Sequence, residues 1–300
     1  MRKSVLVFGS ACVDVIIRVD HLPKREENLH PSGQQFRLGG CACNVAGILG
    51  RGGAEVTFVA PVGMQGVFGP WVLSALRGQS WAEPVCLQNG ENGCCYCLVE
   101  PDGERTFISC HGVEYTFSPE WMERFRGQAF DYTYVCGLEV EESTGGLLAE
   151  WLEQAEIGML LYAPGPRGLH VPEERTRQLL KLHPLLHLNR LEAMQMAHAD
   201  SLEAAMGALT DATGNAVIVT LGADGAMVLE PGQSPLHIPA VQDVKVVDTI
   251  GAGDAHAGAV LLGLSRGWTL SDSVAFANRV AAKVTAQEGA SLKDDRILRT

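Results

Sequence analysis

The chain has little positive charge for its length. Its 300 residues include 23 lysines and arginines against 35 aspartates and glutamates, which gives a formal net charge of −12. Nucleic acids and anionic membrane surfaces are bound mainly through basic side chains, so we expect neither as a partner. An anionic small molecule such as ATP remains compatible with this charge, because backbone N–H groups and a bound cation can hold it locally.

A long apolar segment is also missing at the N-terminus. The first apolar run, residues 5–8, ends at Gly9, which is too short for a signal peptide or a membrane-spanning helix. We therefore expect a cytoplasmic protein. An odd number of cysteines, nine, in such a chain favours free thiols over a disulfide framework.

The cysteine clusters at 41–43 and 94–97 lack the two Cys-x-x-Cys pairs of a structural zinc site. Small buried thiols are the favoured interpretation over zinc. Three common motifs are absent as well. The chain has no Gly-x-x-x-x-Gly-Lys-Ser/Thr, no Gly-x-Gly-x-x-Gly after the first strand and no Gly-x-Ser-x-Gly. A dehydrogenase on a doubly wound sheet is therefore disfavoured.

What the chain does contain is the glycine-rich segment Asp-Thr-Ile-Gly-Ala-Gly-Asp at residues 248–254. The β-branched run at 244–247 and the small residues at 255–259 predict a strand, a glycine turn and a helix. The N–H groups at the start of a helix favour an anion. Asp254 would repel a bound phosphate, unless it takes a proton from a hydroxyl that attacks that phosphate. The alternative is that Asp254 is the N-cap of a buried helix.

The remaining pattern predicts an α/β fold. Apolar runs alternate with helical stretches, which indicates a parallel sheet covered by helices on both faces, in one domain spanning residues 1–300. The strands are expected at 5–8, 57–60, 132–136, 159–162 and 217–220, and the helices at 45–49, 144–156, 173–182 and 201–213.

A second, smaller sheet is expected to form a lid over the site. Apolar and polar residues alternate over 13–19, and 34–38 is a further short strand. The segment 93–110 predicts a β-hairpin with its turn at residues 100–103.

Several polar residues follow predicted strands or precede predicted helices. Asp14 lies past the first strand, where ligands bind in open α/β sheets. Asn189 and Glu192 lie on one helical turn and could hold a hydrated Mg²⁺; the alternative is a capping box. The glycines of segment 220–225 could admit a nucleotide, or form an ordinary hairpin turn.

Taken together and in this order, these segments resemble the ribokinase-like PfkB family of carbohydrate and nucleoside kinases, over about residues 4–292. The most specific matches are Gly-Gly-x-x-x-Asn at 39–44 and the segment 248–254. The resemblance implies a three-layer αβα sandwich with a mainly parallel central sheet and a small β-sheet lid. It also implies ATP and Mg²⁺ as cofactors, with phosphoryl transfer to a primary hydroxyl.

The resemblance further implies roles for individual residues. Asp254 corresponds to the base that deprotonates the acceptor, beside an anion hole formed by Gly251, Ala252 and Gly253. Asp248, with the backbone near Gly289, suits a K⁺ ion. The other implied positions are Asp14, Gly40, Asn44 and Glu139 for the substrate, Asn189, Thr220, Gly222, Gly225 and Asn278 for the nucleotide, and Glu192 for Mg²⁺ through water.

Some positions depart from the family pattern. His256 stands where the family often has Phe, and is interpreted as a pocket wall or as a core or surface histidine. A serine common near the K⁺ position is replaced near Lys293. Segment 62–69 is one residue longer than usual and lacks an acidic residue, and segment 162–164 lacks the Asp of many sugar kinases.

The acceptor is left open. A ribose-, fructose- or keto-sugar-acid-like sugar leads, with a nucleoside of the pseudouridine or adenosine type as the alternative. A sugar acid needs a cation, Arg105 or Arg167. A nucleoside needs a stacking aromatic, for which the candidates are Tyr96, Phe107 and Tyr115. A non-catalytic binding protein would have lost Asp254 or the glycines. We expect a homodimer formed through the lid.

Overall fold

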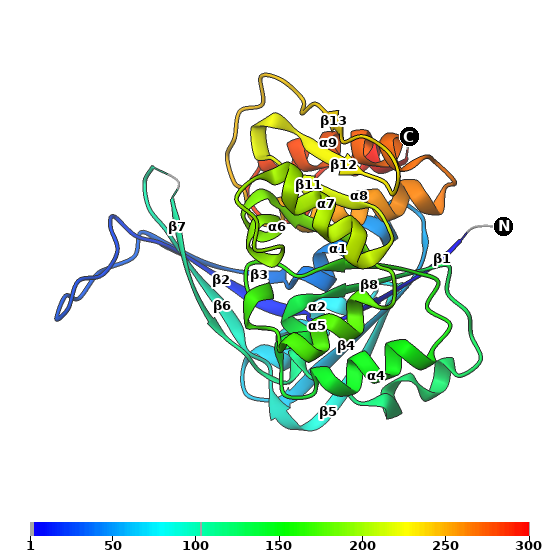
Figure 1. The fold of residues 1–300 in the computed structure, drawn as a ribbon. Helices are drawn as coiled ribbons and strands as arrows, with labels where there is room; N and C mark the ends of the chain where they lie inside the picture. Colours follow the sequence, from blue (N-terminus) through cyan, green and yellow to red (C-terminus); the bar gives the residue numbers. More distant parts are fainter. Residues whose placement is uncertain (1–2, 103, 300) are drawn as a thin grey trace.

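The computed structural model describes residues 3–102 and 104–299 and is built around one large sheet (Figure 1). Its nine strands have the order β13-β12-β11-β10-β9-β8-β1-β4-β5, and all neighbours are parallel except at β12 and β13. The strands are β1 (Ser4–Phe8), β4 (Glu55–Gln65), β5 (Ala82–Glu91), β8 (Tyr132–Cys136), β9 (Met159–Ala163), β10 (Leu185–Asn189), β11 (Val217–Thr220), β12 (Ala226–Leu229) and β13 (Leu236–Ile238).

Helices cover both faces of this sheet. Val5 and Val7 of β1 pack in a core with α1, α8 and α9, whereas Leu6 and Phe8 pack in a second core with α4, α5 and α7. Successive side chains of a strand point to opposite faces, so the sheet lies between two helical layers. The predicted αβα sandwich is confirmed. The helices are α1 (Cys41–Arg51), α2 (Phe68–Leu76), α3 (Gly137–Glu141), α4 (Gly145–Gln154), α5 (Glu173–Leu180), α6 (Arg190–Met196), α7 (Leu202–Thr213), α8 (Ala252–Ser265) and α9 (Leu270–Thr285).

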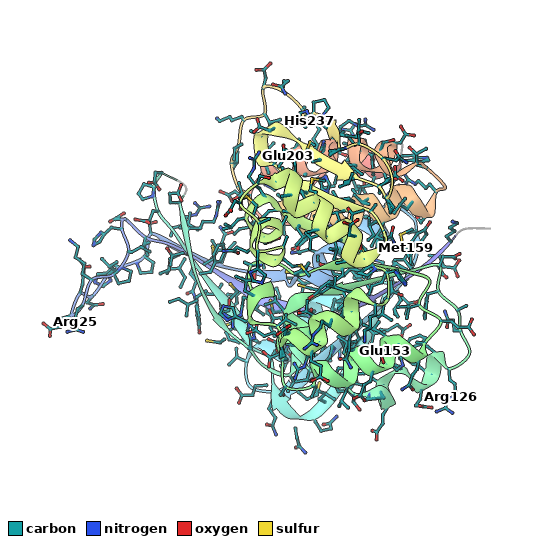
Figure 2. All side chains as sticks on the ribbon, in the orientation of Figure 1. Arg25, Arg126, Glu153, Met159, Glu203 and His237 are labelled. Carbon is teal, nitrogen blue, oxygen red and sulfur yellow. The ribbon has the colours of Figure 1, made fainter. Side chains whose placement is uncertain are left out.

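A separate sheet of four strands projects to one side of the main body (Figure 1). Its order is β3-β2-β6-β7, with β2 and β6 parallel and the other neighbours antiparallel. The loop between β2 and β3 extends farther still, with Arg25 near its tip (Figure 2). The strands are β2 (Cys12–Arg18), β3 (Gly33–Gly39), β6 (Cys94–Val99) and β7 (Arg105–Cys110).

One face of the smaller sheet is turned toward the glycine-rich segment. The register pairs Asp14 with Cys95, and Ile16 with Cys97, so these four side chains share a face, which we call the inner face of the lid. Ile16 and Cys97 pack, together with Val99, against Ile250. The strands thus fall where a lid was expected, although Gly103 of the predicted turn lies outside the described residues. A single-domain organisation stays a prediction.

The strand predicted at 244–247 is wrong. Residues 239–250, all of them described, contain no strand, and the side chains of Val246 and Val247 are 61% and 41% exposed. The backbone N–H groups of Val247 and Asp248 donate instead to the carbonyl of Thr285 at the end of α9. β-branched residues favour strands through packing on neighbouring strands, and here the neighbour is a helix end.

The cysteine and membrane expectations can be compared with the structure. All nine cysteines are free. Within residues 3–102 and 104–299, no group of three or more His, Cys, Asp or Glu side chains could hold a metal ion. Over the same residues, no helix combines the length and the apolar character that crossing a bilayer requires.

Candidate active site

Asp254 lies in the first turn of α8, directly beyond the glycine turn. Gly251, with φ 70°, is the N-cap of the helix, so the alternative that Asp254 is the cap is wrong. Asn44 of α1 donates a hydrogen bond from Nδ2 to Asp254 Oδ2 at 2.8 Å. Burial raises the pKa of Asp254, and the hydrogen bonds from Asn44 and Cys41 oppose that rise. A carboxylate whose pKa is raised by burial is a better proton acceptor than an exposed aspartate.

Gly40 allows α1 to start against the turn that precedes β2. Its φ is 99°, and a Cβ there would lie 2.5 Å from the carbonyl oxygen of Ser10, so a side chain would push α1 away. This close approach sets Asn44, one turn further along α1, beside Asp254. The spacing of the glycine pair and the asparagine in the sequence therefore has a local steric cause in this chain.

Asp14 lies on the inner face of the lid, and its pKa depends on the charges of the glycine-rich segment 248–254. Burial raises the pKa of Asp14 to about 7, and the negative charges of Asp254 and Asp248 add to the rise, while Arg37 opposes it. These carboxylates come from a lid strand and from both ends of the glycine-rich segment. The fold therefore brings the predicted acceptor-binding and catalytic acids to one place.

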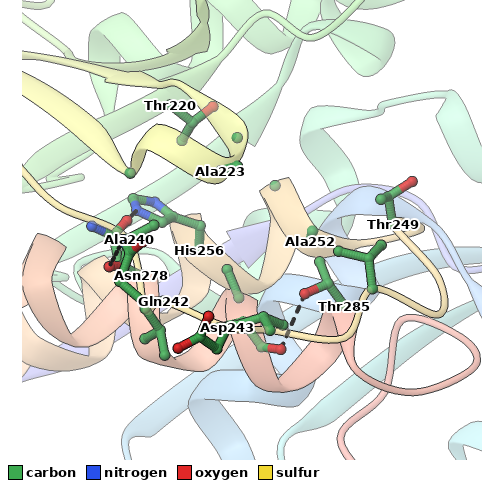
Figure 3. A pocket seen from close by; sticks show the side chains of 18 residues that line it. Thr220, Ala223, Ala240, Gln242, Asp243, Thr249, Ala252, His256, Asn278 and Thr285 are labelled. Atoms are coloured by element: carbon green, nitrogen blue, oxygen red, sulfur yellow. Dashed lines mark hydrogen bonds between the residues drawn. The ribbon is translucent and has the colours of Figure 1, made fainter.

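A cavity of about 460 Å³ opens on the other side of the glycine turn (Figure 3). The turn between β11 and β12 forms one wall, with Thr220 and Ala223 facing His256 and Asn278 across the cavity. Because β11 and β12 are antiparallel, this turn is both a hairpin and a cavity wall. The predicted residues that line the cavity are Thr220, Gly222, Gly225, Ala252, Gly253 and Asn278.

Asn189 and Glu192 form the capping box that was the alternative interpretation. Glu192 N–H donates to Asn189 Oδ1 at 2.8 Å, and Asn189 N–H donates to Glu192 Oε2 at 2.9 Å. Burial raises the pKa of Glu192, and the charge of Asp254 contributes to that rise. Glu192 therefore faces the same site, and its Oε1 makes no hydrogen bond within the described residues. Two oxygen-bearing side chains fit a hydrated Mg²⁺ that is held mainly by phosphate and water.

Glu139 of α3 is completely buried. Its Oε1 accepts a hydrogen bond from the N–H of Ser10 at 2.8 Å, and burial raises its pKa to about 7. Glu139 therefore holds the turn between β1 and β2, which leads to Asp14. A direct contact of Glu139 with a substrate stays a prediction.

A match to a protein family decides the class of this protein. The profile of the pfkB family carbohydrate kinases matches residues 2–296. The chain belongs to the PfkB family of carbohydrate kinases. It is 36% identical to the uncharacterised sugar kinase YegV of Escherichia coli (strain K12) over 292 residues. This alignment covers 96% of this chain and 90% of the relative. It is 25% identical to mouse ketohexokinase over 298 residues, covering 96% of this chain and 98% of the relative.

Solved structures agree with this family at the level of the fold. Adenosine kinase from Sinorhizobium meliloti superposes with a TM-score of 0.85 at 21% identity, covering 98% of this chain and 97% of that one. Arabidopsis thaliana ribokinase, solved with ribose and ATP, gives a TM-score of 0.80 at 19% identity, covering 99% and 98%. This PfkB-family protein is an ATP-dependent kinase.

The sequence did not predict a buried polar chain that includes two residues of the cavity wall, His256 and Asn278. His187 Nε2 lies 2.8 Å from His256 Nδ1, and His256 Nε2 lies 3.1 Å from Asn278 Oδ1. The Asn278 oxygen can only accept, so His256 donates to it and His187 donates to His256. Asn278 Nδ2 in turn donates to the carbonyls of Ile238 and Pro239, which directly precede Ala240 of the cavity wall. His256 lines the cavity and is only 2% exposed. It is therefore both a pocket-wall and a core residue, and the interpretation as a surface histidine is wrong.

We expect His256→Phe to flatten the pH dependence of stability. Burial lowers the pKa of His256 to about 4, against 6.5 for an exposed histidine. As pH falls from 6.5 to 4, the unfolded chain takes up a proton that the folded chain excludes, so the wild type loses stability. Between these two pH values, His256→Phe should therefore lose up to about 3 kcal/mol less unfolding free energy than the wild type.

Urea unfolding at pH 7 and pH 4.5 measures the effect. His170→Gln, at an exposed histidine, is the control and should retain the wild-type pH dependence. An equal loss of unfolding free energy in His256→Phe and in the wild type would contradict a neutral, buried His256.

Proposed function

We propose that this kinase transfers the γ-phosphoryl group of ATP to a primary hydroxyl of a neutral sugar of the ribose or fructose type. The observation that carries the proposal is the position of Asp254. The carboxylate is held by Asn44, its neighbour Gly253 lines the nucleotide cavity, and its charge acts on Asp14 of the lid. The base therefore stands between the proposed donor side and the proposed acceptor side.

The proposed reaction needs positioning and charge neutralisation more than covalent chemistry. Asp254 takes the proton of the attacking hydroxyl. The backbone of residues 251–253, at the positive end of α8, holds the transferred phosphoryl group. Asn189 and Glu192 would hold a hydrated Mg²⁺, which neutralises phosphate charge when bound. ATP occupies the 460 Å³ cavity, with Thr220, Gly222, Gly225 and Asn278 on its walls.

The acceptor side is formed by the lid and α1. Asp14 and Asn44 bind the hydroxyls of the acceptor. Gly40 and Glu139 both contact the turn at Ser10, and so fix where α1 and β2 place these two side chains. With a pKa of about 7, Asp14 changes between accepting and donating a hydrogen bond near neutral pH. A lid closed over this site excludes water, which would otherwise compete with the acceptor.

A neutral acceptor is favoured over a sugar acid because the two arginines that the sequence offers as carboxylate partners are engaged elsewhere. Arg105 lies 3.1 Å from Asp248, and Arg167 is paired with Glu141. Neither guanidinium is therefore available as the principal partner of a substrate carboxylate. Relatives that carry the names ribokinase and ketohexokinase also support a neutral sugar.

A nucleoside acceptor is the second candidate, because one aromatic side chain on the lid is well placed. Phe107 pairs with Cys97 in the register, so it lies on the inner face, and its side chain is 52% exposed. An exposed ring there can stack on a base. The other two aromatic candidates are less suited: Tyr96 lies on the opposite face, and Tyr115 is buried and stacked on His111.

The deciding experiment is ADP release with MgATP and a panel of ribose, fructose, 2-keto-3-deoxygluconate, adenosine and pseudouridine. Turnover with ribose or fructose supports the proposal, and adenosine or pseudouridine as the preferred acceptor supports the second candidate. Preference for the keto-sugar acid would overturn the argument from the paired arginines. Asp254→Asn, whose turnover should be strongly reduced, serves as the control for contaminating kinases.

The face of the lid opposite the inner face is suited to a homodimer. Phe36 of β3 pairs with Val15 of β2, which pairs with Tyr96 of β6, and Tyr96 pairs with Ile108 of β7. These side chains therefore form one row across the sheet. Phe36 and Ile108 are 45% and 55% exposed. We propose that two lids pack through this row, in a cytoplasmic enzyme; light scattering that gives the mass of one chain would contradict the dimer.

A further inference from the structure

Arg105 of the lid forms an ion pair with the first aspartate of the glycine-rich segment. Arg105 Nη2 lies 3.1 Å from Asp248 Oδ1, and the two side chains are 12% and 5% exposed. Arg105 begins β7 and pairs with Val99, which pairs with Arg18, so Arg105 belongs to the inner face. The ion pair thus connects the lid to the segment that leads into the glycine turn.

The Asp248 carboxylate has no oxygen without a partner. Oδ1 accepts the N–H of Ile250 at 2.7 Å, and Oδ2 accepts the N–H of Gly289 at 2.7 Å. Asp248 therefore fastens the start of the glycine turn to the C-terminal segment. Arg105 supplies the positive charge that a nearly buried carboxylate requires.

A K⁺ ion at Asp248 does not fit this arrangement. Both carboxylate oxygens already accept a backbone N–H, and Oδ1 also faces Arg105. An ion at this carboxylate would lie close to the guanidinium, and the two positive charges would repel each other. Lys293, in place of the serine of many relatives, adds a further positive charge to the adjoining cavity, which Asp14 and Gly289 also line. The residues present therefore disfavour the cation that the family resemblance implies.

We propose that Arg105 replaces the monovalent cation, so that nucleotide binding by this kinase is independent of K⁺. The inference rests on the proposed function for the place of the phosphoryl group, at residues 251–253. Asp248 lies three residues before Gly251, and its uncompensated charge would oppose a phosphate there. A guanidinium held by the chain neutralises that charge at any K⁺ concentration. Because Arg105 is part of the lid, the charge is in place only when the lid lies against the glycine-rich segment.

The test compares nucleotide affinity and the thermal unfolding midpoint in K⁺ and in tetramethylammonium at equal ionic strength. The probe for affinity is the Mg²⁺ complex of a non-hydrolysable ATP analogue, titrated by calorimetry. The wild type should show the same affinity in both salts within about twofold. Arg105→Ala should lose about tenfold or more of its affinity in tetramethylammonium, because Asp248 is left without a counter-charge. K⁺ should restore most of that loss and raise the unfolding midpoint of the variant.

Two further variants sharpen the comparison. Arg105→Lys keeps a fixed charge and should remain independent of K⁺. Arg18→Ala is the matched control: Arg18 lies in the same row of the lid but pairs with Glu288, at 2.6 Å, and its removal should leave the response to K⁺ unchanged. Arg105→Gln keeps the stem of the side chain and replaces Arg105→Ala if the alanine variant does not fold.

A wild type whose affinity or unfolding midpoint rises specifically with K⁺ would overturn the proposal. A folded Arg105→Ala or Arg105→Gln that gains no response to K⁺ would also overturn it. A wild type that binds no nucleotide would refute the proposed function instead. The response of the unfolding midpoint to K⁺ would still test the role of Arg105 in that case.

Discussion

Asp254→Asn is expected to lower turnover by roughly 10²–10⁴-fold and to leave nucleotide affinity nearly unchanged. The amide keeps the shape of the side chain but cannot take the proton of the acceptor hydroxyl. Asn44 can still form a hydrogen bond with it, so the contact between α1 and α8 survives. The measurement is kcat with the preferred acceptor, beside a titration of the MgATP analogue.

The stability of Asp254→Asn separates this effect from unfolding. Burial disfavours the charged form of Asp254, so the neutral variant should unfold at a free energy no lower than that of the wild type. Asp211→Asn, on the exposed side of α7, is the control and should match the wild type in kcat. Near-normal turnover in Asp254→Asn would remove this residue from the mechanism.

Gly253→Ala is expected to lower turnover by roughly 10²-fold without loss of stability. Gly253 is in the first turn of α8 and lines the 460 Å³ cavity in which we propose that ATP binds. Apart from Gly253 itself, its two chain neighbours and the nearby backbone of α8, no atom of the described residues lies within 4 Å of the position that a Cβ would take there. The methyl group would therefore enter the space proposed for the phosphoryl group. Alanine favours a helix over glycine by up to about 1 kcal/mol, so the unfolding midpoint should stay or rise.

Gly251→Ala is the matched variant for this prediction. Gly251 has φ 70°, and a Cβ there would lie 2.3 Å from Cβ of Ala290. This substitution should therefore cost both stability and turnover, whereas Gly253→Ala should cost turnover alone. Normal kcat and KM for ATP in Gly253→Ala would show that no phosphate approaches this backbone.

Much of the frame of this kinase could be predicted from local sequence. The alternation of apolar strands and helical stretches indicates a parallel sheet between helices, because each pattern fixes which faces must be buried. The lid hairpin and the helix after the glycine turn are encoded in the same way. The pair of motifs at 39–44 and 248–254 specifies the class of site, since glycine is required where backbone, helix start and anion come close together.

Local patterns were less reliable where a neighbour decides the structure. The β-branched run at 244–247 has the composition of a strand, but it passes the end of α9 and pairs with Thr285. β-branched residues favour a strand through packing on a neighbouring strand, and here the backbone bonds to a helix end instead. Composition alone carries no information about that partner.

The sequence by itself therefore determined the αβα class, the glycine turn and the chemical nature of Asp254. Only the tertiary structure decided which side chains meet. Asn44 reaches Asp254 across 210 positions, His187 reaches His256 across 69, and the lid brings Arg105 to Asp248. Such contacts arise when helices and sheets pack, and they leave no periodic signal in either segment. The physical reason is that burial and turn preferences act over a few neighbouring residues, whereas charge pairing in a site depends on the whole fold.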